Sequence, residues 1–312
     1  MLAQKVREEA DSAGYSVTPY DLPEFDITDR ELALRVLSQL RPDVIVNCAA
    51  YTNVDGAEAE EHLAMRVNGE GPGNLAHVAK HLGATLMHIS TDYVFDGKKN
   101  TPYQENDPVA PMSAYGRTKL AGEQAIIESG LERFFIVRTS WLYGPGGKNF
   151  VETIIRLAKE REELRIVADQ VGSPTYTGDL ATAIFNLLKS TDHASRLTEH
   201  EVSTDHGSRI TDHDPKKTPH PSLLTPYGIY HFSNSGQCSW YEFAAEIVAQ
   251  MEGKGEPLKV KKIVPIRTEE YPLPAPRPAY SVFSKEKYRA ATGAEIPEWR
   301  ESLSRYLEER IE

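Results

Sequence analysis

The chain has 312 residues, 40% of them hydrophobic, which fits one large domain or a domain with a smaller partner. Its formal net charge of −11 argues against nucleic acid or an anionic membrane surface as a partner. No run of about 18 apolar residues exists, so no membrane span is predicted. The two cysteines, Cys48 and Cys238, form no disulfide framework and are typical of a reducing cytoplasm.

The chain opens on a helical pattern at residues 1–6, and residues 15–20 have the pattern of a strand that ends at Asp21. In a dinucleotide-binding fold, a strand and a glycine-rich turn precede such a helix. Neither is present, so we expect the central strand of the sheet to be missing and the given sequence to begin too late. The alternative is a protein that has abandoned cofactor binding. Asp21 stands where a carboxylate would hold a ribose 2′-hydroxyl, and Asp26 and Ile27 where an adenine edge would rest.

Strand patterns then alternate with helical patterns. The apolar runs 44–48, 85–89 and 134–138 predict buried strands, and the segments between and beside them, 32–40, 57–81 and 114–128, predict helices. This alternation is typical of a Rossmann-like, doubly wound parallel α/β sheet, here without its first strand. Ligands bind at the carboxyl ends of such strands. Small and polar residues follow all three strands, so we expect one ligand-binding rim.

The second half of the chain predicts a smaller C-terminal substrate domain. We assign residues 1–150 to the dinucleotide-binding domain, with 176–190 and a strand within 227–235 returning to it, and residues 151–175 and 236–312 to the substrate domain. The helices expected in the latter cover residues 240–251 and 299–309.

Residues 191–226 are rich in Ser, Thr, Asp, His and Pro. A metal site is one interpretation, but a solvated, mobile insertion is favoured because no cysteine or tight ligand spacing accompanies the histidines. The histidines are His193, His200, His206, His213 and His220.

Tyr115 and Lys119 are four residues apart in a predicted helix and therefore share a face of it. A nearby ammonium group would lower the pKa of the phenol and make it a proton donor or acceptor near neutrality. Ser90 or Thr91, at the end of the preceding strand, would hold the oxygen that receives this proton. The group suits proton transfer to a carbonyl oxygen while a hydride reaches the carbon.

Six motifs resemble the extended short-chain dehydrogenase/reductases, and within them the dTDP-4-dehydrorhamnose reductases. They cover most of the chain outside the insertion. The motifs are N-C-A-A-Y-T-N-V-D from Asn47, I-S-T-D-Y-V-F-D-G from Ile89, Y-G-R-T-K from Tyr115, R-T-S-W-L-Y-G from Arg138, D-Q-V-G-S-P-T from Asp169 and R-P-A-Y-S from Arg277.

The resemblance implies reduction of the C4 keto group of dTDP-4-dehydro-L-rhamnose with NADPH or NADH, for a cell-surface polysaccharide precursor. It makes Tyr115 the proton donor, Thr91 its partner on the reacting oxygen and Lys119 a contact to the nicotinamide ribose. Further residues would line the two ligands. Those for the cofactor are Ala49, Ala50 and Thr52; those for the nucleotide sugar are Val54, Asp92, Trp141, Asn149, Gln170 and Arg277.

Other functions of similar proteins stay open. The β subunit of methionine adenosyltransferase resembles this family and is a non-enzymatic regulatory partner. Sugar-nucleotide epimerases and 4,6-dehydratases are further alternatives, although Tyr93 stands where a dehydratase would carry Glu. Some family members hold magnesium at a dimer contact, so the resemblance extends to Mg²⁺ and to a homodimer, but no metal ligand can be assigned in this sequence.

Overall fold

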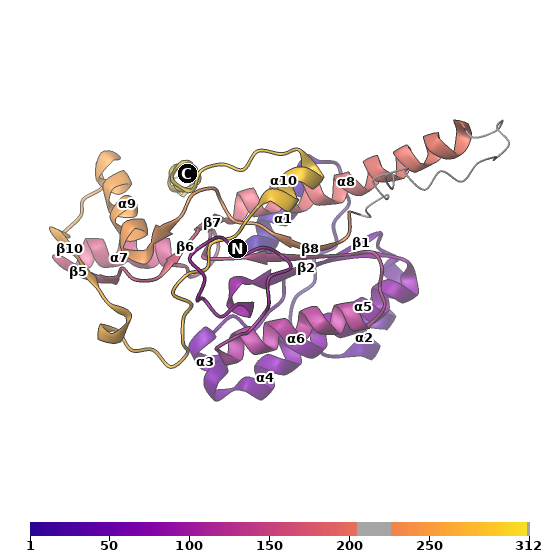
Figure 1. Ribbon diagram of the computed structural model, residues 1–312, viewed down its shortest axis with the longest axis horizontal. Helices are drawn as coiled ribbons and strands as arrows, with labels where there is room; N and C mark the ends of the chain where they lie inside the picture. Colours follow the sequence, from indigo (N-terminus) through magenta and orange to yellow (C-terminus); the bar gives the residue numbers. More distant parts are fainter. Residues whose placement is uncertain (205–225, 311–312) are drawn as a thin grey trace, which may run out of the picture.

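A computed structural model describes residues 1–204 and 226–310, without the side chains of residues 192–204. Its centre is a parallel sheet in the order β1-β2-β3-β8 (Figure 1). These strands are β1 (Val44–Asn47), β2 (Thr85–Thr91), β3 (Phe134–Thr139) and β8 (Gly228–His231). The α/β parallel sheet and four of the five strands expected in it are confirmed. The register places Asn47 beside His88 and Thr91 beside Thr139, so the carboxyl ends of β1 to β3 meet at one edge.

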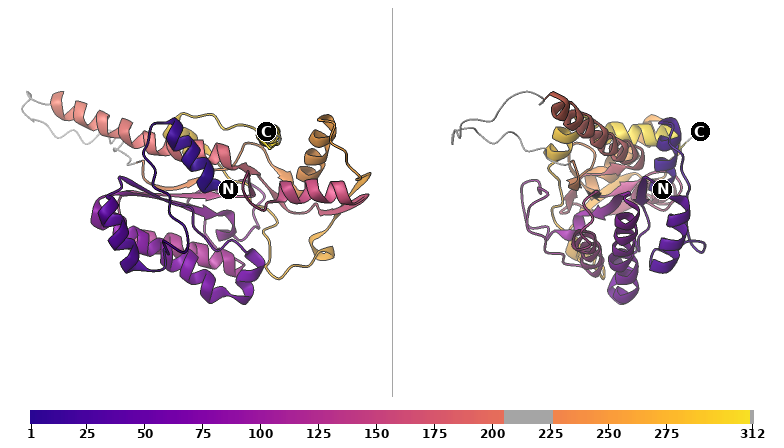
Figure 2. Two further views of the ribbon diagram at one scale, coloured as in Figure 1. Left: turned by 180° about the vertical axis from the view of Figure 1, so that it is seen from behind. Right: turned by 90° about the vertical axis from the view of Figure 1, so that its right-hand side faces the viewer.

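Helices cover both faces of this sheet, as Figures 1 and 2 show. On one face lie α2 (Arg30–Leu40), α5 (Gly71–Leu82) and α6 (Ala114–Glu128); on the other lie α1 (Leu2–Ser12), α8 (Thr177–Thr204) and α10 (Glu286–Thr292). Each face has its own core. Leu37, Leu75 and Leu86 belong to the first, and Val6 and Phe135 to the second. The apolar stripes of the helices therefore bury both sides of the strands.

Residues 15–20 were expected to form a strand, and this prediction is wrong. The segment is irregular, and Tyr15 and Tyr20 are 44% and 45% exposed. A strand requires a neighbour with free backbone groups. Residues 15–20 pair with no strand, and β1 is the edge strand of the described sheet. The β propensity of the segment therefore has no pairing to support it.

The single helix expected over residues 57–81 is also wrong in part. The structure has α3 (Val54–Ala59), α4 (Glu61–Met65), a π-helical turn (Arg66–Glu70) and then α5. Pro72, in the first turn of α5, has no N–H to donate to the carbonyl of Asn68. The side-chain amide of Asn68 also ties this turn to the loop after β1. It accepts the N–H of Tyr51 at 2.8 Å and donates to the C=O of Tyr51 at 3.0 Å.

A second group of elements extends from one end of the sheet, at the left of Figure 1. Its β5 (Glu163–Val167) pairs in parallel with β10 (Lys262–Ile266). Its helices are α7 (Phe150–Glu160), α9 (Trp240–Gly253) and α11 (Trp299–Glu309), which share a core with Phe243 and Trp299 at its centre. Two short ladders connect this group to the sheet: β4 (Leu142–Tyr143) with β7 (Thr175–Tyr176), and β6 (Val171–Gly172) with β9 (Cys238–Ser239). Single 3₁₀ turns cover Asp92–Val94 and Thr268–Glu270.

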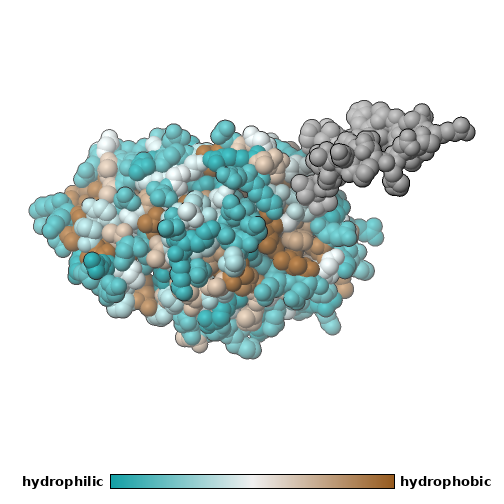
Figure 3. Space-filling view, viewed as in Figure 1, coloured by the Kyte–Doolittle hydropathy of each residue, from teal (hydrophilic) through white to brown (hydrophobic). Residues whose placement is uncertain are grey.

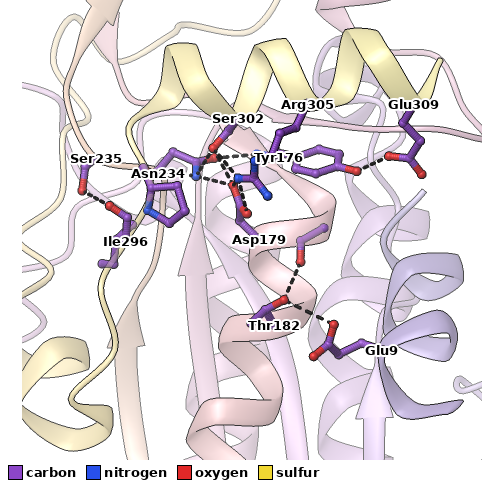
Figure 4. A network of polar contacts seen from close by, with 12 residues as sticks. Glu9, Tyr176, Asp179, Thr182, Asn234, Ser235, Ile296, Ser302, Arg305 and Glu309 are labelled. Atoms are coloured by element: carbon purple, nitrogen blue, oxygen red, sulfur yellow. Dashed lines mark hydrogen bonds and ion pairs between the residues drawn. The ribbon is translucent and has the colours of Figure 1, made fainter. Parts of the chain in front are cut away.

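Asp179, near the start of α8, fastens α11 to the sheet (Figure 4). Its carboxylate accepts hydrogen bonds from Asn234 (2.6 Å), Ser302 (2.6 Å) and Arg305 (2.6 Å). Nearby, the Tyr176 hydroxyl donates to Glu309. Because the 7% exposed carboxylate is satisfied on every side, this network holds the last helix in one place.

Helix α8 continues through residues 191–204 to Thr204. Residues 205–225 lie outside the described residues, and so do the side chains of all five histidines of the expected insertion. Within the described ranges, no helix is long and apolar enough to cross a membrane. On the face shown in Figure 3, apolar residues lie in separate groups among hydrophilic ones.

Candidate active site

The rim at the carboxyl ends of β1, β2 and β3 brings Thr91, Asp92 and Tyr115 together. Tyr115 lies in the first turn of α6. Ser113 caps this helix, and its hydroxyl accepts the N–H of Gly116 at 3.1 Å. A Cβ at Gly116 would lie 2.3 Å from the carbonyl oxygen of Tyr93. Glycine therefore lets α6 start directly against the turn that follows β2. The rings of Tyr93 and Tyr115 meet edge to face, with centroids 5.5 Å apart.

Thr91 and Asp92 form a hydrogen-bonded pair at the end of β2. The Thr91 hydroxyl donates to Oδ1 of Asp92 (3.0 Å) and accepts from the N–H of Tyr93 (3.3 Å). Burial raises the pKa of Asp92 to about 6, although the hydroxyls of Ser281 and Thr91 act in the opposite direction. The second oxygen, Oδ2, is buried and has no hydrogen-bond partner among the described residues. An acid in this position titrates far closer to neutrality than an exposed aspartate does.

Lys119 does not lower the pKa of Tyr115, so this part of the prediction is wrong. Burial raises the pKa of the Tyr115 phenol to about 12, the charge of Asp92 adds to this, and only the Thr91 hydroxyl lowers it. The Lys119 amine instead donates to the backbone carbonyl of Ile89 on β2 at 2.7 Å. Spacing of four residues puts two side chains on one face, but a long side chain still turns to the acceptor it can reach.

A buried polar chain holds the Lys119 amine on β2. His88 lies between Lys119 (Nε2 to Nζ, 3.3 Å) and Asn47 (Nδ1 to Nδ2, 3.1 Å). Burial lowers the pKa of Lys119 to about 8, and for the same reason the pKa of His88 lies well below its usual range. The imidazole is therefore neutral at pH 7 and acts as a fixed hydrogen-bonding bridge.

The residues expected to line the cofactor form two groups. At the end of β1, Ala49 and Thr52 are exposed and Ala50 is half-buried, so small side chains leave this edge open beside Lys119. Asp21 is exposed, and its carboxylate caps the N–H of Leu22.

Asp26 and Ile27 are less open than Asp21. The Asp26 side chain accepts the N–H of Thr28 at 2.8 Å. Ile27 is buried in the core beneath α2 and α5.

Trp141, expected at the sugar, forms an aromatic wall with Trp240. The indoles stack with centroids 3.5 Å apart and planes 8° apart. Trp141 has a φ of 48°, a left-handed conformation that side chains other than glycine adopt at a cost. Gly172 also lies against this indole, because a Cβ there would come within 2.6 Å of the Trp141 ring. Trp141 thus contacts both the Trp240 indole and a backbone without a side chain.

Gly172→Ala is expected to move the Trp141 indole and to destabilise the protein by about 1–3 kcal/mol through overpacking. Urea denaturation and the KM for the nucleotide sugar would both report the change. The matched control is Gly253→Ala, where no atom lies within 4 Å of the added Cβ. In that helix the alanine should be neutral or stabilise by up to about 1 kcal/mol. Equal behaviour of the two variants would show that Gly172 does not constrain Trp141.

Of the remaining residues expected at the sugar nucleotide, Asn149 and Gln170 form hydrogen bonds within the protein. Val54 begins α3 at the rim. Asn149 caps α7 by accepting the N–H of Glu152 (3.1 Å), and Gln170, 7% exposed, donates to Thr268 (3.0 Å).

Arg277 pairs with Asp55 through both terminal nitrogens, one of them at 2.8 Å. A contact between this guanidinium and a diphosphate would require that pair to open.

Three residues at the site were not predicted: Trp240, Ser281 and His88. Trp240 lies between Ser239 and Glu242, whose capping box indicates a helix start but no site. Ser281 ends the R-P-A-Y-S motif, but its contact with Asp92 comes from a distant part of the chain and was not expected. Among the described residues, no group of three His, Cys, Asp or Glu side chains could hold a metal ion.

Comparison with known proteins agrees with the fold. A crystal structure of dTDP-4-dehydrorhamnose reductase from Bacillus anthracis in complex with NADP is 40% identical, with a TM-score of 0.82, and the match covers 99% of this chain and 95% of that one. UDP-glucose 4-epimerase from Thermus thermophilus, 19% identical with a TM-score of 0.70, shares the fold. The protein is thus of the Rossmann-type class that these reductases and epimerases share.

The sequence comparisons specify the family within this class. A dTDP-4-dehydrorhamnose reductase of Burkholderia thailandensis is 42% identical, and the match covers 91% of this chain and 87% of that protein. The spore coat polysaccharide biosynthesis protein SpsK of Bacillus subtilis is 41% identical over 96% of this chain and 90% of its own length. The family described as RmlD substrate binding domain matches residues 1–211 and 208–311. The chain belongs to this family.

Proposed function

We propose that the protein is an NAD(P)H-dependent reductase that converts dTDP-4-dehydro-L-rhamnose to dTDP-L-rhamnose. The observation that carries this proposal is the meeting of Thr91, Asp92 and Tyr115 at the carboxyl ends of parallel strands. The similar proteins include several named dTDP-4-dehydrorhamnose reductase. No such observation supports a regulatory subunit, an epimerase or a dehydratase.

The residues at the end of β1 fit a dinucleotide. Ala49 and Ala50 leave space beside the strand, and the buried Lys119 amine offers a donor to a ribose hydroxyl. Thr52 would complete this side, and Asp21 and the backbone of Asp26 and Ile27 would face the adenosine half. When bound, the reduced nicotinamide supplies the hydride that reaches the carbonyl carbon.

Tyr115 would give its proton to the C4 oxygen of the sugar. Its raised pKa keeps the phenol protonated at neutral pH, so the donor is present when the negative charge develops on that oxygen. Thr91 would add a hydrogen bond to the same oxygen. Val54 and Trp141 would enclose the sugar ring, with Asn149, Gln170 and Arg277 toward the nucleotide diphosphate. We propose no step through a magnesium ion.

The direct test is oxidation of NADPH or NADH by the purified protein on addition of dTDP-4-dehydro-L-rhamnose, followed at the absorbance of the reduced nicotinamide. Formation of dTDP-L-rhamnose, identified by mass spectrometry and NMR, is the expected result. Comparing the two cofactors tests Asp21, whose charge favours NADH because it repels a 2′-phosphate. A protein that binds the cofactor, never turns over and co-purifies with an adenosyltransferase would overturn the proposal.

Two further features belong to this proposal. The free thiols of Cys48 and Cys238 support a place in the reducing cytoplasm. A homodimer is proposed from the family resemblance alone, and sedimentation equilibrium would give the mass of the particle.

A further inference from the structure

The hydrogen bonds that Thr91 can make depend on whether Asp92 carries a proton. A threonine hydroxyl has one proton to donate and two lone pairs to accept with. One lone pair accepts the N–H of Tyr93 at 3.3 Å, which leaves one proton and one lone pair for Asp92, Tyr115 and the substrate.

An ionised Asp92 would direct both protons of the site away from the substrate. The carboxylate can only accept, so it takes the Thr91 proton across the 3.0 Å contact. The remaining lone pair of Thr91 is then free to accept the phenol proton of Tyr115. In the opposite direction, a Thr91 hydroxyl that donates to the phenol oxygen lowers the pKa of Tyr115. The chain of donation would run from Tyr115 to Thr91 to Asp92.

A protonated Asp92 reverses this chain. Its acid proton is donated to Thr91, whose own proton becomes available, and the Tyr115 proton loses its acceptor within the protein. The unpartnered Oδ2 agrees with this state, because a neutral carbonyl oxygen without a partner costs less to bury than a carboxylate oxygen. Asp92 is 2% exposed, and its pKa of about 6 brings protonation within reach near neutral pH.

We propose that Asp92 works in its protonated form as a positioning residue, whose proton turns the hydroxyl of Thr91 toward the carbonyl oxygen of the substrate. This inference rests on the proposed reductase function. It gives Asp92 a role beyond contact with the sugar: it sets the direction of the hydrogen bonds that receive the developing charge.

The surrounding groups allow this assignment. Burial raises the pKa values of Tyr93, beside Asp92, and of Tyr115 on α6, and the charge of Asp92 raises both further. The segment near the C-terminus contributes the neutral Ser281 hydroxyl. The cation Arg277 also acts on Tyr93, but its partner Asp55 on α3 offsets it. Lys119 is turned toward Ile89. No cation therefore pairs with Asp92 among the described residues.

The test compares the pH dependence of kcat/KM in wild type, Asp92→Asn and Asp92→Ala, with thermal unfolding to check the fold. In wild type, kcat/KM should fall about tenfold per pH unit above the pKa of Asp92. In Asp92→Asn that limb should disappear, because the amide N–H₂ always donates to Thr91. Asp92→Ala should be at least about tenfold slower than Asp92→Asn at every pH. Asparagine and alanine variants that are equally slow would overturn the inference.

Infrared difference spectra of wild type minus Asp92→Asn give a reading that needs no turnover. A protonated carboxyl band at about pH 5 that is lost by about pH 8 is expected, since an ordinary aspartate with a pKa of about 3.9 is already ionised at pH 5. Its absence at pH 5 would overturn the inference. If the band is present and wild type never turns over, the proposed reductase function fails instead, and with it the role of this proton in catalysis.

Discussion

Tyr115→Phe is expected to lower kcat by about 10²- to 10⁴-fold, the range that a general acid contributes. The substitution removes only the hydroxyl, and the ring should keep its edge-to-face contact with Tyr93 at 5.5 Å. Stopped-flow and steady-state rates of NADPH oxidation would measure the loss. Fluorescence titration with NADPH should give an affinity close to that of wild type, because the proposed contacts at the end of β1 remain.

Tyr93→Phe is the matched control for this variant. Tyr93 is the neighbouring phenol. Its ring meets that of Tyr115 edge to face and its backbone N–H donates to Thr91, and a phenylalanine keeps both contacts. Its loss should change kcat by no more than about threefold, as is usual for a substitution that removes no catalytic contact. A Tyr115→Phe protein that is as active as the Tyr93→Phe protein would remove the proposed proton donor.

Most of the sheet could be predicted because its signals are local. The apolar runs that became β2 and β3, and the residues of α6 with Ser113 at its cap, carry their own pattern. Residues 15–20 carry a similar pattern and still form no strand, because pairing depends on a neighbour elsewhere in the chain. The break between α3 and α5 likewise depends on Pro72 and on the contact between Asn68 and Tyr51.

The same division applies to the site. Thr91 and Tyr115 could be placed at one rim because parallel strands end together and the next helix starts there. The direction of the Lys119 amine could not, since it depends on the carbonyl of Ile89 and on His88, which the helical spacing does not reveal. The pKa of Asp92 depends on burial, which raises it, and on the hydroxyl of Ser281, which lowers it from a distant part of the chain.

Glu123→Ala is expected to cost about 3–5 kcal/mol of unfolding free energy, the penalty for leaving one member of a buried ion pair alone. The side chains of Glu123 and Arg138 are 1% and 3% exposed, and the guanidinium donates to both carboxylate oxygens, at 2.7 Å and 3.0 Å. Ser90 on β2 donates to the same carboxylate. Urea denaturation followed by circular dichroism and by tryptophan fluorescence would measure the change and show whether both parts of the chain unfold together.

The control is Glu160→Ala, which removes a pair between Arg156 and Glu160 whose side chains are 59% and 53% exposed. Its loss should cost no more than about 0.5 kcal/mol and should depend on salt, whereas the buried pair should not. A double variant, Glu123→Leu with Arg138→Met, separates charge from packing. It removes both charges, so it should be more stable than Glu123→Ala even though it changes more atoms. A double variant less stable than Glu123→Ala would contradict this explanation. The loss of stability would then come from the missing attraction between the two charges and not from an unpaired, buried Arg138.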